Sequence, residues 1–245
     1  MASFTITYLY HSGFAVSAGD KLMIFDYYND AGATRSLTSG IIDPYELDRY
    51  ASVDVFVSHS HADHFNPAIY KWASHRQIRY IVSYDIPRQY KGTRVEPGDN
   101  LRLGDMDVYV FGSTDLGVSF IIDIGGTLIM HAGDLNLWHW RDESTSLEIE
   151  QAEAEFRAIV SDIVAFLDGR SLDVCFFPLD PRQGPLYDAG ACFFLMQTHP
   201  RIFVPMHFQN RDEVVYDFMR REQQRRTRIL ALTRRGQQFT YQTED

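Results

Sequence analysis

The chain has 245 residues, 45% of them hydrophobic, and a formal net charge of −10. This length can bury a sizeable core, and we expect one globular domain over residues 1–245. The acidic balance argues against a protein that wraps around nucleic acid, because that binding needs Lys and Arg to neutralise phosphates; a small anionic substrate stays compatible. No run approaches the roughly 18–20 apolar residues that cross a bilayer, and the first residues lack the pattern of a secretory signal. We therefore expect a cytoplasmic protein without a membrane span, and leave a homo-oligomer open.

Short segments rich in β-branched and aromatic residues fill the first third of the chain. Strands are predicted at residues 5–10, 13–17, 22–25 and 53–57. A histidine-rich run follows the last of these directly. Asn66 then has the position of a helix N-cap with proline after it, which predicts a helix through about residue 74.

Residues 79–130 return to strand patterns, with Gly125 and Gly126 as a hairpin turn. Thr145 and Glu148 have the spacing of a capping box, which predicts a helix to about residue 167. The remaining predicted elements are a strand, a helix, a strand and a helix, at residues 173–177, 189–198, 201–204 and from Asn210 onward. Two strand-rich blocks, each closed by helices, predict an α/β (α+β) fold, an αββα sandwich of two packed mixed β-sheets with helices on the outer faces.

The run from His59 to His64 is the main candidate for chemistry. His59 and His61 are two residues apart, so in extended chain their imidazoles project to the same side and can share one metal ion. Asp63 and His64 are neighbours at the following turn and can present ligands to a second ion. Imidazole nitrogen and carboxylate oxygen suit zinc, and also manganese or iron. We predict a site for two divalent ions, with zinc favoured.

His-x-His-x-Asp-His after an apolar strand resembles the signature of the metallo-β-lactamase superfamily. The resemblance covers about residues 5–210 and implies the metallo-β-lactamase fold. It also implies two later metal ligands at strand ends: Asp134 after Gly133, whose carboxylate would bridge the two ions, and His207 as the final histidine ligand. Taken alone, Asp134 reads as a turn residue and His207 as a capping or core residue.

The sequence departs from this family at one ligand. The family usually has a further histidine between these motifs, but no histidine lies between His75 and His131. Asp115 is the candidate replacement. Alternatively, Asp115 is an ordinary turn residue, and the first metal site is weaker, holds a water in place of the histidine, or is empty. His131 is expected to face away from Asp134 along the extended segment, which favours a supporting or core role.

Residues 10–14 and 25–28 resemble one branch of the superfamily, the ascorbate-6-phosphate lactonase-like and N-acyl-phosphatidylethanolamine phospholipase-like hydrolases. His11 is equally compatible with substrate binding and with a supporting or core role. The resemblance implies that Asp26 supports the metal loop. Two further residues are candidates for substrate binding: Arg182, which can clamp a carboxylate or phosphate, and Trp138, which can wall a partly apolar pocket. A surface ion pair and a structural aromatic cluster are their alternatives.

We hypothesise a metal-dependent hydrolase in which a metal-bound hydroxide attacks a small lactone, amide or phosphodiester. A divalent ion lowers the pKa of bound water to about 7, and a second ion polarises the substrate oxygen. Asp63 or Asp134 is expected to carry the proton to the leaving group. The alternatives are a non-catalytic or regulatory metal-binding protein with a degraded first metal site, and a diiron redox protein, which a carboxylate at Asp115 would favour.

Overall fold

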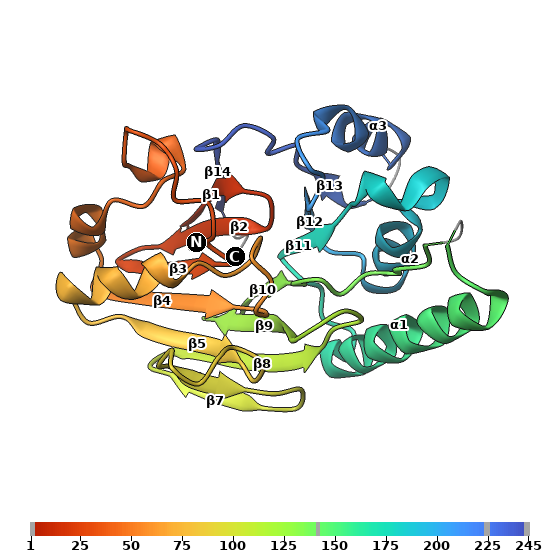
Figure 1. Cartoon of the computed structure of the whole chain (residues 1–245), viewed down its shortest axis with the longest axis horizontal. Coiled ribbons are helices and arrows are strands. Elements are labelled where there is room, and N and C mark those ends of the chain that lie inside the picture. Colours follow the sequence, from red (N-terminus) through yellow and green to blue (C-terminus); the bar gives the residue numbers. More distant parts are fainter. Residues whose placement is uncertain (1–2, 141–142, 223–225, 243–245) are drawn as a thin grey trace. The chain divides into compact units, whose positions relative to one another are not determined.

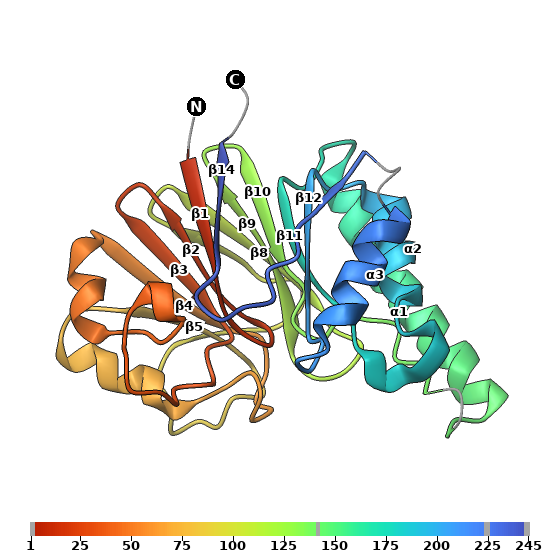
Figure 2. The same ribbon diagram turned by 90° about the horizontal axis from the view of Figure 1, so that it is seen from above.

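Two mixed β-sheets organise the residues that the computed structural model describes, 3–140, 143–222 and 226–242. The chain divides into two compact units, each with one seven-stranded sheet (Figures 1 and 2). Unit 1 comprises Met1–Val95 and Leu232–Asp245, and unit 2 comprises Glu96–Ala231. The expected single domain over residues 1–245 stays a prediction.

The sheet of unit 1 has the strand order β14-β1-β2-β3-β4-β5-β6. Its first four strands pair antiparallel and the pairs from β3 to β6 are parallel. The last strand of the chain pairs with the first, which places both described ends of the chain side by side. The strands are β1 (Ser3–Tyr10), β2 (Gly13–Ala18), β3 (Lys21–Phe25), β4 (Ser52–Val57), β5 (Arg79–Ser83), β6 (Thr93–Val95) and β14 (Gln238–Gln242).

Three alternating valines of β4 explain how this sheet acquires a helical cover. Val53, Val55 and Val57 are buried and belong to one apolar cluster. The same cluster holds Ile69 and Trp72, from the short 3-10 helix Pro67–Ser74 that begins at the predicted Asn66 cap. Further 3-10 helices lie at Leu37–Ser39 and Pro44–Arg49. Burial of these side chains therefore fixes the segment directly after the histidine run.

The sheet of unit 2 repeats the mixed pattern in the order β13-β12-β11-β10-β9-β8-β7. Strands β10 to β13 pair parallel and strands β7 to β10 pair antiparallel. The predicted glycine pair joins β9 to β10. The strands are β7 (Asn100–Leu103), β8 (Met106–Gly112), β9 (Val118–Ile124), β10 (Thr127–His131), β11 (Val174–Pro178), β12 (Ile202–Met206) and β13 (Arg228–Ile229).

Helices α1 (Ser146–Leu167), α2 (Ala189–Thr198) and α3 (Asp212–Glu222) gather on one face of the second sheet (Figure 2). Thr145 and Glu148 form the predicted capping box of α1, with the Thr145 side chain accepting from the Glu148 N–H and the Glu148 carboxylate accepting from the Thr145 N–H. The helix from Asn210 begins later than predicted, at Asp212, because Asn210 has a left-handed φ of 63° rather than the extended backbone of an N-cap. The 3-10 segment Pro181–Leu186 completes the unit.

The direction of the strands decides where the loops of each unit meet. In unit 1, β1, β3, β4 and β5 all run the same way, since two antiparallel pairings separate β1 from β3 and parallel pairings follow. In unit 2 the same reasoning gives β8, β10, β11 and β12 one direction. Loops that follow these strands therefore converge at one sheet edge within each unit.

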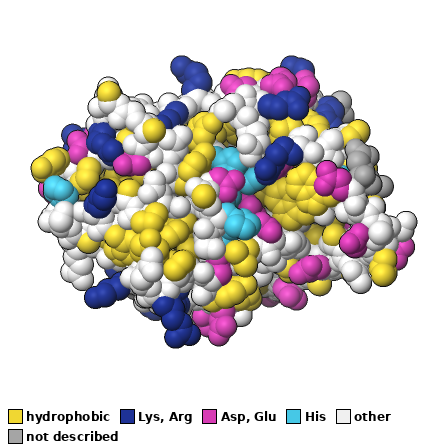
Figure 3. All heavy atoms as spheres, in the orientation of Figure 1, with side chains coloured by type: hydrophobic (Ala, Val, Ile, Leu, Met, Phe, Trp, Pro, Cys, Tyr) yellow, Lys and Arg dark blue, Asp and Glu magenta, His cyan; other side chains and the backbone are white. Residues whose placement is uncertain are grey.

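The expectation that the chain binds no nucleic acid stays a prediction. On the face shown in Figure 3, lysine and arginine side chains are scattered among acidic and apolar ones. None of the helices in the described ranges combines the length and hydrophobicity that crossing a membrane requires.

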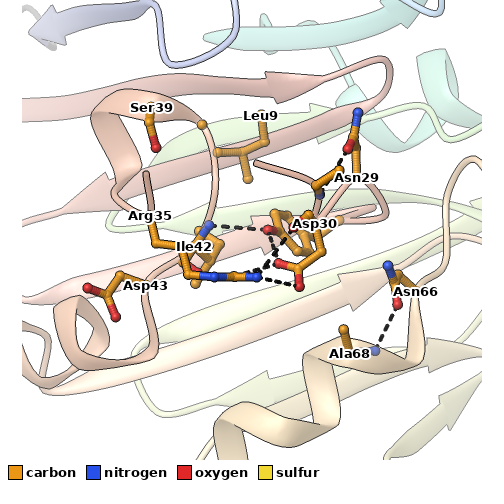
Figure 4. Close-up of polar contacts among 12 residues, drawn as sticks. Leu9, Asn29, Asp30, Arg35, Ser39, Ile42, Asp43, Asn66 and Ala68 are labelled. Atoms are coloured by element: carbon orange, nitrogen blue, oxygen red, sulfur yellow. Dashed lines mark hydrogen bonds and ion pairs between the residues drawn. The ribbon is translucent and has the colours of Figure 1, made fainter. Parts of the chain in front are cut away.

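An ion pair in unit 1 ties the loop after β3 to the segment that follows it (Figure 4). The Arg35 guanidinium donates to both carboxylate oxygens of Asp30, at 2.8 Å each, and to the carbonyl of Ile42 at 3.1 Å. Tyr27 donates its hydroxyl proton to Asp30 at 2.7 Å and accepts from the Ile42 N–H. The Arg35 guanidinium is the main cause of a lowered pKa for the Asp30 carboxyl.

We predict that this pair makes stability fall in acid. The pKa of Asp30 is about 3.9 when the chain is unfolded and lower when it is folded, so its contribution is full at neutral pH and disappears as pH falls through the folded-state pKa. D30N should destabilise the protein at pH 7 by roughly 1–2 kcal/mol, and the difference from wild type should shrink below about pH 4. Urea denaturation of both proteins across pH 3–7 measures this, and a pH-independent difference would contradict it.

Candidate metal centre

The histidine run leaves the sheet of unit 1 at the end of β4 and folds into a tight cluster. His59 and His64 are fully buried and His61 is exposed. The ring centroids of His59 and His64 are 4.0 Å apart, and those of His59 and His61 are 4.7 Å apart. Hydrogen bonds from the His64 and Phe65 N–H groups to the His61 carbonyl close the turn. The bend brings the rings of His59 and His64 together at an interplanar angle of 41°.

A buried carboxylate beneath this cluster orients its rings. Asp26, 1% exposed at the end of β3, accepts hydrogen bonds from the Ser58 N–H at 2.8 Å and from the Ser58 hydroxyl at 2.6 Å. The same carboxylate lies 2.8 Å from Nδ1 of His64, and the Ser58 hydroxyl lies 2.9 Å from Nδ1 of His59. A carboxylate on Nδ1 fixes the ring and directs Nε2 as the metal-binding nitrogen. Asp26 therefore acts on both buried histidines, on one of them through Ser58.

The donor atoms of unit 1 fall into two sets that suit divalent metal ions. Nitrogen atoms of His59 and His61 lie within 4.8 Å of each other. Ligand atoms of Asp63, His64 and His11 also lie within 4.8 Å of one another. Imidazole nitrogens with one carboxylate oxygen are the donors that zinc, manganese and iron accept. The pairing of His59 with His61, and of Asp63 with His64, is the one that the sequence predicts.

In unit 2 the predicted ligands Asp115, Asp134 and His207 come together at one sheet edge. Nε2 of His207 is 3.5 Å from Oδ1 of Asp134, and carboxylate oxygens of Asp115 and Asp134 lie within 4.8 Å of each other. Thr114 joins the loops after β8 and β10, because its hydroxyl donates to the carbonyl of Asn136 and accepts from the Asn136 N–H. The loop after β8, which has no histidine, thus holds Asp115 beside Asp134.

A second carboxylate–histidine pair supports His207. Oδ2 of Asp180, fully buried after β11, is 2.9 Å from Nδ1 of His207. Burial by itself raises the pKa of Asp180, but hydrogen bonds from His207 and from the Arg182 guanidinium outweigh it and lower that pKa to about 2. Asp180 is therefore ionised at neutral pH. The sequence places this loop near the site through Arg182 but does not identify the role of Asp180. Asp180 follows a strand that runs parallel to β12, and this position is the feature that could have identified it.

The two predicted substrate-binding residues also lie near His207 or its partner. Trp138 donates its indole N–H to the backbone carbonyl of Asp134 at 2.8 Å, and its ring meets the His207 ring edge-on with 5.7 Å between centroids. It stacks with Trp140 at 5.9 Å. The Arg182 guanidinium is bound to the Asp180 carboxylate. Substrate binding by either residue stays a prediction.

His131 ends β10, three residues before Asp134. It is fully buried, and its Nδ1 accepts a hydrogen bond from the Gly133 N–H at 3.2 Å. This contact closes the turn that leads to Asp134. The position fits the supporting role that the sequence favours.

Comparison with known proteins places the fold. No protein-family model matches the chain. A UPF0173 metal-dependent hydrolase from Heliobacterium modesticaldum is 24% identical over 225 residues, which cover 83% of this chain and 82% of that protein. Igni18, a metallo hydrolase from Ignicoccus hospitalis, is similar with a TM-score of 0.69 at 16% identity, over 99% of this chain and 100% of that one.

A third similar protein is YhfI from Bacillus subtilis, a metallo-β-lactamase fold protein, with a TM-score of 0.62 at 12% identity over 98% of this chain and 100% of that one. The chain has the metallo-β-lactamase fold. The expected fold, two mixed sheets accompanied by helices, is therefore confirmed. Within the metallo-β-lactamase fold, the lactonase-like and phospholipase-like branch stays a prediction.

We predict that D26N weakens metal binding without abolishing folding. An amide has one oxygen and cannot accept the hydrogen bonds of the Ser58 N–H, the Ser58 hydroxyl and His64 together, so His64 and His59 lose their fixed orientation. Loss of a residue that orients a metal ligand typically costs about 10–100-fold in affinity. Competition with a chelator measures the affinity for Zn²⁺.

D54N is the matched control for D26N. Asp54 is an equally buried carboxylate of unit 1, 1% exposed, but it pairs with Arg79. Its substitution should leave the affinity for Zn²⁺ unchanged. Equal affinity of D26N and wild type would show that Asp26 does not position the ligands.

Proposed function

We propose that this chain is a metal-dependent hydrolase that uses two divalent metal ions, with zinc favoured. The observation that carries the proposal is the repeated carboxylate–histidine pair: Asp26 holds Nδ1 of His64 in unit 1, and Asp180 holds Nδ1 of His207 in unit 2. Each pair belongs to a group of histidine and aspartate donors. The similarity to the metal-dependent hydrolase of Heliobacterium modesticaldum supports the same reading.

The proposed ligand sets combine the donor pairs of unit 1 with the ligands that the sequence predicts in unit 2. His59 and His61 would hold the first ion, with Asp115 in place of the family's missing histidine. Asp63 and His64 would hold the second ion, with His207 as a further ligand. Asp134, which lies near both Asp115 and His207 in unit 2, would bridge the two ions.

Two divalent ions would supply Lewis-acid activation of water and of the substrate oxygen at neutral pH. The protein's own side chains would orient the metal ligands and transfer protons. The Asp63 carboxylate is 42% exposed, so it can exchange a proton with a leaving group, whereas Asp134 is buried. We propose Asp63 as the better placed of the two predicted proton carriers.

The proposed substrate is a small lactone, amide or phosphodiester. Trp138 and Trp140 are stacked and half-buried, with Trp138 beside His207, and they would offer an apolar wall to one part of such a molecule. Arg182 would act through Asp180, because its guanidinium is bound to that carboxylate. The positive charge that binds an anionic substrate would then come from the two metal ions rather than from Arg182.

We predict that H61A loses hydrolytic activity and one bound ion while remaining folded. His61 is exposed, so its removal leaves no buried cavity, but it removes one nitrogen of the first ligand set. The loss of kcat/KM should exceed the roughly 10–100-fold expected for a residue that only orients a ligand. Turnover of chromogenic lactone and phosphodiester substrates and elemental analysis of bound metal measure the two effects.

H75A is the matched control, since His75 is an exposed histidine at the end of the helix Pro67–Ser74 and contacts Tyr45. It should keep wild-type metal content and turnover. Activity in H61A would refute the mechanism. Folded wild type that retains no metal and shows no turnover when zinc is supplied would favour a non-catalytic protein, and bound iron with oxygen-dependent activity would favour a diiron redox protein.

A further inference from the structure

The turn between β1 and β2 holds a histidine in a backbone conformation that histidines seldom adopt. Tyr10 pairs with Gly13 across a two-residue turn, after an irregularity in the ladder at Tyr8 and Tyr10. Tyr10 has a φ of 118° and His11 a φ of 57°, both in the region that favours glycine. Such strain persists when the surrounding structure holds it, and it concentrates at functional sites.

Several contacts hold this turn and aim the His11 ring inward. The His11 N–H donates to the Tyr8 hydroxyl at 2.8 Å, and the ring meets those of Tyr28 and His64 edge-on, with centroids 5.9 and 5.6 Å apart. A Cβ on Gly13 would lie 3.1 Å from the backbone carbonyl oxygen of Asp26, so the turn packs closely on the strand end that orients the histidine run. His11 is only 5% exposed.

Nε2 of His11 lies beside the donor atoms of the second ligand set. Its Nε2 is 3.3 Å from Oδ2 of Asp63, and ligand atoms of His11, Asp63 and His64 lie within 4.8 Å of one another. Nδ1 of His64 faces Asp26, so Nε2 of His64 is the nitrogen that serves this set. Two imidazoles and one carboxylate are a set of donors that zinc accepts.

We propose that His11 is a direct ligand of the second metal ion, through Nε2, beside Asp63 and His64. This inference rests on the proposed function and adds a ligand that the His-x-His-x-Asp-His run does not contain. Unit 1 then supplies three donors to this ion from two separate strand ends.

H11G tests this proposal, because glycine adopts the left-handed backbone without strain and removes only the imidazole. The metal-free full chain would be titrated with Co²⁺ and with Zn²⁺, and bound metal counted by elemental analysis after buffer exchange. Wild type should retain two equivalents. H11G should retain one, or bind the second at least 10-fold more weakly, and its Co²⁺ absorption spectrum should change because one nitrogen donor is lost.

H199G is the matched control. His199 also has a left-handed φ, 43°, but it is exposed at the end of α2. This variant should bind two equivalents with wild-type affinities. The same result for H11G would overturn the proposal, since His11 would then be a structural partner of Asp63.

A second variant, H11N, separates ligand loss from misfolding. Asparagine tolerates a left-handed φ, yet its side chain is too short to place a donor where Nε2 of His11 lies. Folded H11N with the same loss of one equivalent supports the proposal, and metal-free H11G and H11N that both fail to fold overturn it. Wild type that binds no metal contradicts the proposed function itself, whereas two equivalents in wild type and in H11G contradict only the assignment of His11.

Discussion

The carboxylate of Asp26 is the constraint on which the histidine cluster of unit 1 depends. It accepts from the Ser58 N–H and hydroxyl and faces Nδ1 of His64, while Ser58 in turn faces Nδ1 of His59. A buried carboxylate is costly unless its oxygens are satisfied, so these hydrogen bonds stabilise Asp26 as much as Asp26 orients the rings. The same arrangement recurs at Asp180 and His207 in the other unit.

Strand direction explains how residues so far apart in sequence come together within each unit. Asp26 and His64 are separated by 38 residues, yet they follow β3 and β4, which pair in parallel. Asp180 and His207 follow β11 and β12, which pair in the same way. Each carboxylate therefore reaches the histidine of the neighbouring strand end. The sheets provide rigid supports, and the loops after them carry the chemistry.

Local signals predicted the elements well. The capping box at Thr145 and the glycine pair before β10 depend on neighbouring residues, so the sequence shows them directly. The pairing of His59 with His61 also follows from spacing alone. Asp180 and His11 needed the structure, since the partner of Asp180 depends on strand order and the inward aim of His11 depends on a strained turn. Asn210 satisfied the spacing of a cap but not its backbone conformation.

We propose that the histidines and aspartates of this fold hold two metal ions through nitrogens that buried carboxylates orient. A crystal structure of the zinc-loaded protein with anomalous data at the zinc edge tests it most directly. We expect two anomalous peaks, one about 2.0–2.1 Å from nitrogens of His59 and His61, and the other at the same distance from Nε2 of His64. Peaks absent from these nitrogens, or an ion bound to Nδ1 of His64 in place of Asp26, would contradict it.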